Sequence, residues 1–155
     1  MAKMRTKATL SLVDVNVLLA LLDGDHPDHE VATNWFDTPG MQWALCPFTE
    51  TAMLRYLTSP KAIGMSMAEA TEILNKWKNW PGYHYVALQE DWQTVTRPFS
   101  KHLQGHNQIT DAFLLGTAIQ KKIVLVTFDK GFLHMGRDFI DHVHLLSQEG
   151  LTPAQ

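Results

Sequence analysis

The 155-residue chain contains a single cysteine and no excess of positive charge. One thiol, Cys46, excludes a disulfide framework and a zinc site built on cysteines. Its apolar neighbours at 43–45 favour a buried structural thiol over a reactive one. The 13 Lys and Arg stand against 16 Asp and Glu, a net charge of −3 with the eight His neutral. This balance excludes a histone-like or polybasic binder, whose affinity for phosphate depends on excess positive charge, but not a nucleic-acid substrate held in one cleft.

Long hydrophobic runs are also missing. The longest, 10–22, is too short to cross a membrane and is interrupted by Asp14 and Asn16. Basic residues precede it at positions 3, 5 and 7, but the internal charge and the lack of a small-residue cleavage site argue against an export signal. We therefore expect a cytoplasmic protein with no membrane association. The absence of repeats and linkers, together with the length, favours one domain over 1–155.

Short hydrophobic runs alternate with helical patterns along the chain. Strands are predicted at 10–13, 43–46, 83–88, 123–126 and 143–146. Helices are predicted at 17–22, 31–35, 47–56, 66–77, 92–99 (disturbed by Pro98) and 109–120. This alternation predicts an α/β domain with a mainly parallel sheet, in which ligands bind beyond the carboxyl ends of the strands.

Four acidic residues fall at those ends. Asp14 follows the first strand, Glu50 lies in the first helical turn after the second, Asp111 opens the clearest helix, and Asp129 lies three residues beyond Val126. A single acid at a helix start is more often a cap or a dipole partner than a ligand. Several carboxylates in apolar surroundings, however, repel one another unless a cation joins them. Oxygen ligands suit Mg²⁺ or Mn²⁺, and such a site fits phosphodiester hydrolysis.

Each acid also lies in a short motif: LVDVNVLL at 12–19, PFTETAMLR at 47–55, ITDAFL at 109–114 and VLVTFDKGF at 124–132. In this order and spacing the four resemble the motifs of PIN domains, specifically VapC-type toxins of bacterial toxin–antitoxin pairs. The resemblance spans about 10–146. Members commonly carry an acid where this chain has Gly131.

The resemblance implies a PIN-like three-layer α/β/α sandwich that acts as a Mg²⁺- or Mn²⁺-dependent endoribonuclease on an RNA such as a tRNA or rRNA loop. It also implies a homodimer and a VapB-type antitoxin that inserts an Arg or Lys into the acidic site. The roles it implies are catalysis and metal binding for Asp14, Glu50, Asp111 and Asp129, and positioning for Asn16 and Thr127. From the residues themselves, Arg55 is a candidate for contact with an RNA phosphate, with the site carboxylates or with a surface acid. Lys130 is a candidate for a basic rim that contacts single-stranded RNA.

Other functions were weighed against this one. A haloacid-dehalogenase-type phosphatase would need a second Asp where this chain has Asn16. A degenerate, non-catalytic PIN-like binding module is the remaining alternative, although all four acids are present. His26 and His29 fit a solvated turn before a helix better than a metal site, and Trp80 or Trp92 are candidates for base stacking. The motifs are compatible with a site for one metal ion or for two. They are also compatible with a biological role in growth arrest or in RNA processing.

Overall fold

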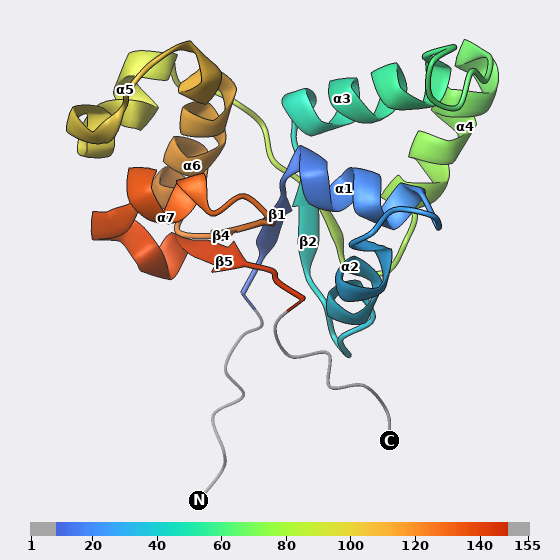
Figure 1. Ribbon diagram of the computed structural model, residues 1–155, viewed down its shortest axis with the longest axis horizontal. Coiled ribbons are helices and arrows are strands. Elements are labelled where there is room, and N and C mark those ends of the chain that lie inside the picture. The colour runs from blue at the N-terminus through green and yellow to red at the C-terminus, as the bar shows by residue number, and fades with distance from the viewer. Residues whose placement is uncertain (1–8, 149–155) are drawn as a thin grey trace, which may run out of the picture.

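The computed structural model describes residues 9–148 and contains one five-stranded sheet (Figure 1). The strand order is β3-β2-β1-β4-β5, and every neighbouring pair is parallel. The central strand β1 (Ser11–Val13) lies between β2 (Trp43–Leu45) and β4 (Val124–Thr127), while β3 (Tyr83–Tyr85) and β5 (Val143–Leu145) form the edges. The predicted α/β class with a parallel sheet is therefore confirmed. The basic residues at 3, 5 and 7 lie outside the described part.

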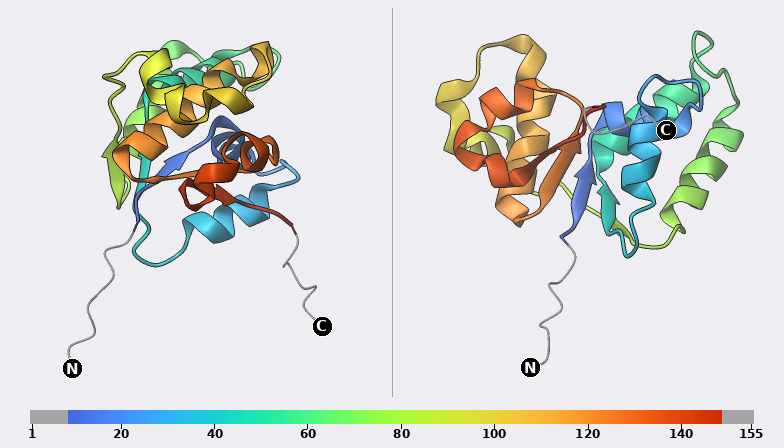
Figure 2. Two further views of the ribbon diagram at one scale, coloured as in Figure 1. Left: turned by 90° about the vertical axis from the view of Figure 1, so that its left-hand side faces the viewer. Right: turned by 60° about the horizontal axis from the view of Figure 1, so that its bottom comes forward.

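Helices cover both faces of the sheet, as the two sides of Figure 1 and the right-hand view of Figure 2 show. One face packs against α1 (Val15–Leu22), α2 (His29–Phe36), α3 (Pro47–Thr58) and α4 (Met67–Lys78). The other packs against α5 (Trp92–Thr96), α6 (Ile109–Lys121) and α7 (Gly131–Met135). Short 3-10 helices lie at Arg97–His102 (η1), His106–Gln108 (η2) and Arg137–His142 (η3). The result is the expected three-layer sandwich. Within 9–148 no helix is both long and apolar enough to span a membrane.

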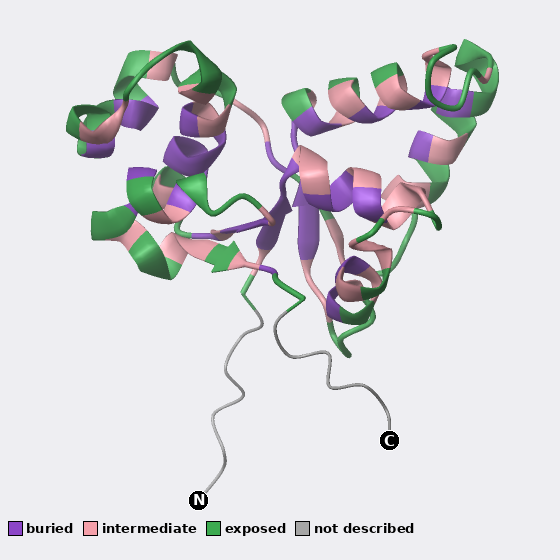
Figure 3. Ribbon diagram, viewed as in Figure 1, coloured by how far each residue is buried: buried purple, intermediate pink, exposed green. Residues whose placement is uncertain are grey.

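The two faces of the sheet have separate cores because alternate side chains of a strand point to opposite sides. In β1, Leu12 packs with the α5–α7 layer and Val13 with the α1–α4 layer, and both are fully buried. In β2, Trp43 packs with the α1–α4 layer and Ala44 packs with the α5–α7 layer. The central strands are accordingly buried along their length, whereas the outer faces of the helices are exposed (Figure 3). A strand covered on both faces explains the continuous hydrophobic runs in the sequence.

The helix boundaries follow local capping chemistry. Ser66 and Glu69 form a reciprocal capping box at the start of α4, and Pro47 occupies the first turn of α3, where a missing N–H costs nothing. The helix predicted at 92–99 ends as α5 at Thr96 and continues as η1, which contains Pro98. The predicted strand at 83–88 is shorter than expected, and α7 and η3 were not predicted. The bounds of β1, β2 and β4, whose carboxyl ends position the acidic residues, agree with the predicted strands to within one residue.

Candidate active site

Asp14 is the buried centre of the acidic cluster. It follows β1, is only 4% exposed, and its carboxylate accepts two short hydrogen bonds. The Val15 N–H donates to Oδ1 at 2.7 Å and so caps α1, while the Thr127 hydroxyl donates to Oδ2 at 2.7 Å. Burial raises the pKa of Asp14, the two hydrogen bonds lower it, and the nearby charge of Asp129 raises it, with a net upward shift. Asp14 is therefore a carboxylate that a cation would stabilise.

Thr127 and Asn16 join the end of β1 to the end of β4. The Thr127 oxygen donates to Asp14 and also accepts from the Asn16 amide at 3.2 Å and from the Asp129 N–H at 3.0 Å. The Asn16 carbonyl oxygen accepts from the Phe128 N–H at 3.2 Å. Thr127 is fully buried, so its hydroxyl has a fixed set of partners. This network holds the loop after β4 against Asp14, which is the position expected of residues that orient a ligand set.

Asp111 and Asp129 complete a cluster of three carboxylates. Asp111 lies in the first turn of α6, half-buried, and its pKa is raised to about 6, first by burial and then by the charges of Asp14 and Asp129. Asp129 is exposed, and its Oδ1 accepts the Gly131 N–H at 2.7 Å. The mutual repulsion shows that the three groups lie within electrostatic reach of one another. We refer to Asp14, Asp111 and Asp129 as the Asp cluster.

Glu50 has a different environment from the Asp cluster. It lies in the first turn of α3 and forms an ion pair with Lys78, the last residue of α4. Burial, and then the charge of Glu50, raise the pKa of the Tyr83 phenol to about 12. The Lys78 ammonium also lies 5.7 Å from the ring centroid of Tyr85. Sequence reasoning missed Lys78, because nothing in its helical pattern indicates that the end of α4 reaches the start of α3.

Arg55 and Lys130 are exposed on the surface, Arg55 near the end of α3 and Lys130 directly after Asp129. Within residues 9–148, neither has a carboxylate within ion-pair distance. Their charges therefore remain available to a ligand. Lys130 lies beside the Asp cluster in the chain, whereas Arg55 lies five residues beyond Glu50 on α3.

The Asp cluster has the donor chemistry for a hard divalent cation. Its oxygen atoms suit Mg²⁺ or Mn²⁺, and a cation would stabilise the ionised forms of Asp14 and Asp111, whose pKa values are raised by burial and then by repulsion. In the described part of the chain, no three His, Cys, Asp or Glu side chains are already arranged around one point. The donors therefore fit the ion chemically, and the side chains of Asp111 and Asp129 would rotate to close around it.

The remaining residues that the sequence singled out have structural contacts. Cys46, the residue before α3, is fully buried in the core on the α5–α7 side of the sheet, as predicted. His26 Nδ1 accepts the Asp28 N–H at 3.0 Å, within the turn before α2. His29 Nδ1 lies 2.7 Å from the Ala20 carbonyl oxygen, to which it donates. These contacts fix the α1–α2 connection and place His26 in the turn before α2, whose N-cap residue is Asp28.

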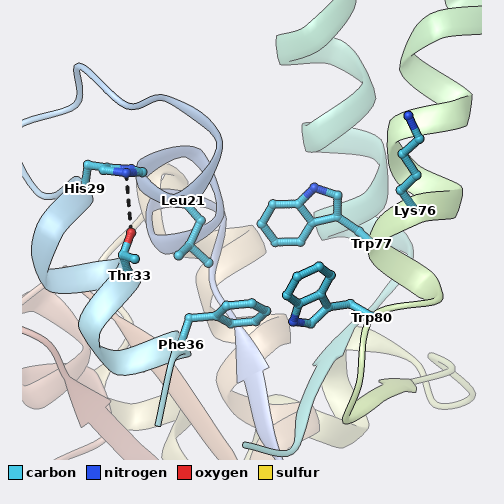
Figure 4. A pocket seen from close by; sticks show the side chains of 7 residues that line it. All are labelled: Leu21, His29, Thr33, Phe36, Lys76, Trp77 and Trp80. Atoms are coloured by element: carbon cyan, nitrogen blue, oxygen red, sulfur yellow. Dashed lines mark hydrogen bonds between the residues drawn. The ribbon is translucent and has the colours of Figure 1, made fainter.

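An apolar groove of about 360 Å³ opens between α1, α2 and α4 (Figure 4). Leu21, Phe36, Trp77 and Trp80 face one another across it, and Trp80 is 58% exposed. Phe36 and Trp77 are in aromatic contact, with ring centroids 5.9 Å apart. The groove is lined mainly by apolar atoms and contains none of the acidic residues described above, so it is chemically suited to an apolar segment and not to a metal ion.

Comparison with known proteins agrees with this geometry. The PIN domain family model matches residues 11–138. Ribonuclease VapC44 of Mycobacterium tuberculosis is 38% identical over 128 residues, 77% of this chain and 86% of its own length. Ribonuclease VapC38 of the same organism is 33% identical over 125 residues, with coverage of 79% and 86%.

Solved structures show the same fold at lower identity. A chain of VapBC2 from Rickettsia felis, crystallised with a fragment of promoter DNA, superposes with a TM-score of 0.62 at 14% identity and covers 89% of this chain and 99% of its own. A toxin–antitoxin complex from Klebsiella pneumoniae gives 0.59 at 18% identity, with coverage of 86% and 95%. From the matched family model and these relatives, the chain belongs to the PIN domain family, in its VapC-type branch.

Proposed function

We propose that this protein is a Mg²⁺- or Mn²⁺-dependent endoribonuclease, the toxin component of a toxin–antitoxin pair, built as a single PIN domain over 1–155. The observation that carries the proposal is the Asp cluster at the carboxyl end of the sheet, where burial and then the neighbouring carboxylate charges raise the pKa values of Asp14 and Asp111. The names of the VapC ribonucleases support the same activity. The intact cluster favours a nuclease over a degenerate binding module.

In this proposal Asp14, Asp111 and Asp129 hold the ion. When bound, the ion supplies Lewis-acid chemistry for attack of water on an RNA phosphate. Thr127 and Asn16 keep Asp14 oriented through the network described above, so that one carboxylate oxygen position stays fixed while Asp111 adjusts. The hydrolysis consumes water and separates one phosphodiester into a phosphate end and a hydroxyl end.

Glu50 is the fourth proposed acid, at a site whose ion pair with Lys78 must open before it can serve the ion. Arg55 and Lys130 are proposed as contacts to RNA phosphates, because both carry charges without an acidic partner in the described part of the chain. A cation beside such a cluster offsets the negative charge that the approaching RNA backbone would otherwise meet.

The test is cleavage of total cellular RNA by the purified protein with Mg²⁺, with Mn²⁺ and with a chelator. We expect cleavage with either ion, loss of cleavage with chelator, and loss in Asp14→Asn. The matched control is Asp141→Asn, which removes an exposed acid of η3 and should cleave like the parent. Equal cleavage by Asp14→Asn, or cleavage unaffected by chelator, would contradict the proposal.

We also propose a VapB-type antitoxin as partner, with an apolar segment in the groove of Figure 4 and an Arg or Lys directed to the Asp cluster. The supporting observations are the apolar lining of the groove and the toxin–antitoxin complexes among the structural neighbours. Co-expression with the neighbouring short reading frame should give a stable complex that does not cleave RNA. The variant Trp80→Ala should lose the complex and keep cleavage, whereas an unchanged complex would exclude the groove.

Homodimer formation and a cytoplasmic location stay predictions of the sequence. Size-exclusion chromatography with light scattering measures the first directly, on the protein alone and on the antitoxin complex. A mass of one chain at micromolar concentration would contradict the dimer without affecting the proposed chemistry.

A further inference from the structure

Two phenylalanines join the helices that carry Glu50 and Asp111. Phe48 is the second residue of α3 and Phe113 lies in the second turn of α6. Their ring centroids are 5.3 Å apart and the ring planes are inclined at 67°, an edge-to-face contact. Phe48 stands two residues before Glu50 and Phe113 two residues after Asp111. The pair therefore bridges the helix starts at the edge of the sheet where the acidic residues lie.

Phe48 is positioned as a surface residue and not as part of the core. It is 36% exposed, whereas Met53 and Leu57 on the same helix are buried and pack against the sheet. Phe113 is less exposed and contacts the Phe48 ring, so the contact orients a side chain that remains 36% exposed. A single exposed apolar residue is common on protein surfaces. Phe48 is a candidate binding residue because its ring contacts Phe113 and because a charged residue is exposed on the same helix.

The charged residue on the same helix as Phe48 is Arg55. Positions 48, 51 and 55 follow one another at helical spacing, and all three residues are exposed, so Phe48 and Arg55 share one face of α3. Within residues 9–148, Arg55 has no carboxylate in ion-pair distance. An exposed aromatic ring and an unpaired guanidinium on one helix face are a combination that binds single-stranded nucleic acid, because the ring stacks on a base and the cation contacts a phosphate.

We propose that Phe48, supported by Phe113, is a stacking platform for one unpaired RNA base, with Arg55 on a phosphate of the same strand. This inference rests on the proposed ribonuclease function and specifies its substrate as an unpaired strand. A base in a duplex is stacked on both sides and does not offer its face to Phe48. The platform therefore selects loops and single strands beside the Asp cluster.

The two tryptophans considered from the sequence are placed elsewhere. Trp80 lines the apolar groove between α1, α2 and α4. Trp92 packs against the α5–α7 core, and its indole N–H donates to the Ile109 carbonyl oxygen at 2.9 Å, which fixes the start of α6. The stacking role thus belongs to Phe48 and Phe113, which sequence reasoning did not single out.

The experiment measures RNA binding without cleavage, in the Asp14→Asn background and in chelator. The probes are a fluorescein-labelled short oligouridine and a ribose-phosphate oligomer of the same length without bases. Phe48→Ala should weaken oligouridine binding by about 10- to 100-fold, the range given by loss of one base–aromatic stack. It should leave binding of the baseless oligomer unchanged, because the phosphates and Arg55 remain. Phe48→Trp should keep oligouridine binding.

Two further variants separate stacking from packing and from charge. Phe48→Leu keeps an apolar contact with Phe113 but has no aromatic face, so it should behave like Phe48→Ala while melting like the parent. Arg55→Gln should weaken both probes alike and reduce the slope of log affinity against log salt by about one. Ile63→Ala, at an exposed aliphatic residue beyond the end of α3, is the matched control and should change nothing.

The inference is overturned if Phe48→Leu binds oligouridine like the parent, or if Phe48→Ala weakens both probes equally. It is also overturned if Phe48→Ala binds both probes normally and loses only the antitoxin, which would make the platform a protein contact. Metal-dependent cleavage by the wild type alongside any of these results would leave the ribonuclease proposal standing. Absence of cleavage by the wild type would contradict both the ribonuclease proposal and the stacking platform that rests on it.

Discussion

Replacing Asp111 by Asn should stabilise the metal-free protein while removing a proposed metal ligand. The pKa of Asp111 is raised from 3.8 to about 6, first by burial and then by the charges of Asp14 and Asp129. The folded state therefore holds a proton on this carboxyl that the unfolded state has lost. Below about pH 4 the group is protonated in both states and costs nothing. From about pH 4 to about 6 stability falls, because only the unfolded state has lost the proton, and above about pH 6 the full cost is reached and stays constant. Asn stays neutral throughout.

The size of the effect follows from the same shift. A pKa change from 3.8 to about 6 corresponds to at most about 3 kcal/mol. Asp111 is only half-buried, so solvent screening removes a large part of that cost. The charge also interacts favourably with the amino-terminal end of α6, by about 0.5 kcal/mol, and Asn gives this up. The expected net gain is about 1 kcal/mol, or about 2–4 °C in Tm for a chain of this length.

The assay is thermal unfolding of the wild type and Asp111→Asn in chelator, from about pH 4 to about pH 8. The variant should match the wild type at the acid end and melt higher at the alkaline end, and added Mg²⁺ should raise the Tm of the wild type alone. Asp141→Asn controls for loss of an exposed acid. A variant that is no more stable at about pH 8, or equally more stable at about pH 4, would refute the reasoning.

Three further outcomes are expected. Gly116→Ala should lower stability by about 2–3 kcal/mol in urea unfolding, because the new Cβ would overlap the Val95 carbonyl where α5 crosses α6; an unchanged midpoint would contradict this. Thr127→Val should cost about 2–3 kcal/mol at neutral pH by removing a donor from the buried Asp14 carboxylate, and less in acid, where Asp14 is protonated. Mn²⁺ should raise the Tm of the wild type in calorimetry but not that of Asp14→Asn, and equal increases would place the ion elsewhere.

The acidic edge of the sheet was predictable because its position depends on topology alone. Asp14 follows β1 and Asp129 follows β4, and parallel neighbouring strands bring such residues to one edge whatever the loops do. The hydrophobic run 123–126 and the alternation of strands with helices were sufficient to predict that arrangement. The capping box at the start of α4 is similarly local, because Ser66 and Glu69 are only three positions apart.

The contacts that depend on the relative placement of two helices were not predictable. Glu50 and Lys78 meet because the end of α4 comes beside the start of α3, and Phe48 meets Phe113 across two layers of the sandwich. No periodicity in a single segment carries that information. The short α7 was missed for a different reason, since five residues beginning at Gly131 are too few to show a helical repeat.

These contacts change how the net charge of −3 is understood. Glu50 is already neutralised by Lys78, so the uncompensated acids of the site are the three of the Asp cluster. The other 13 of the 16 acidic residues equal the 13 Lys and Arg in number. The net charge of −3 thus equals the charge of the three Asp cluster carboxylates, and a bound divalent ion would offset two of these three negative charges. RNA binding at the site should therefore strengthen when the ion is bound, because the phosphates then approach a nearly neutral protein.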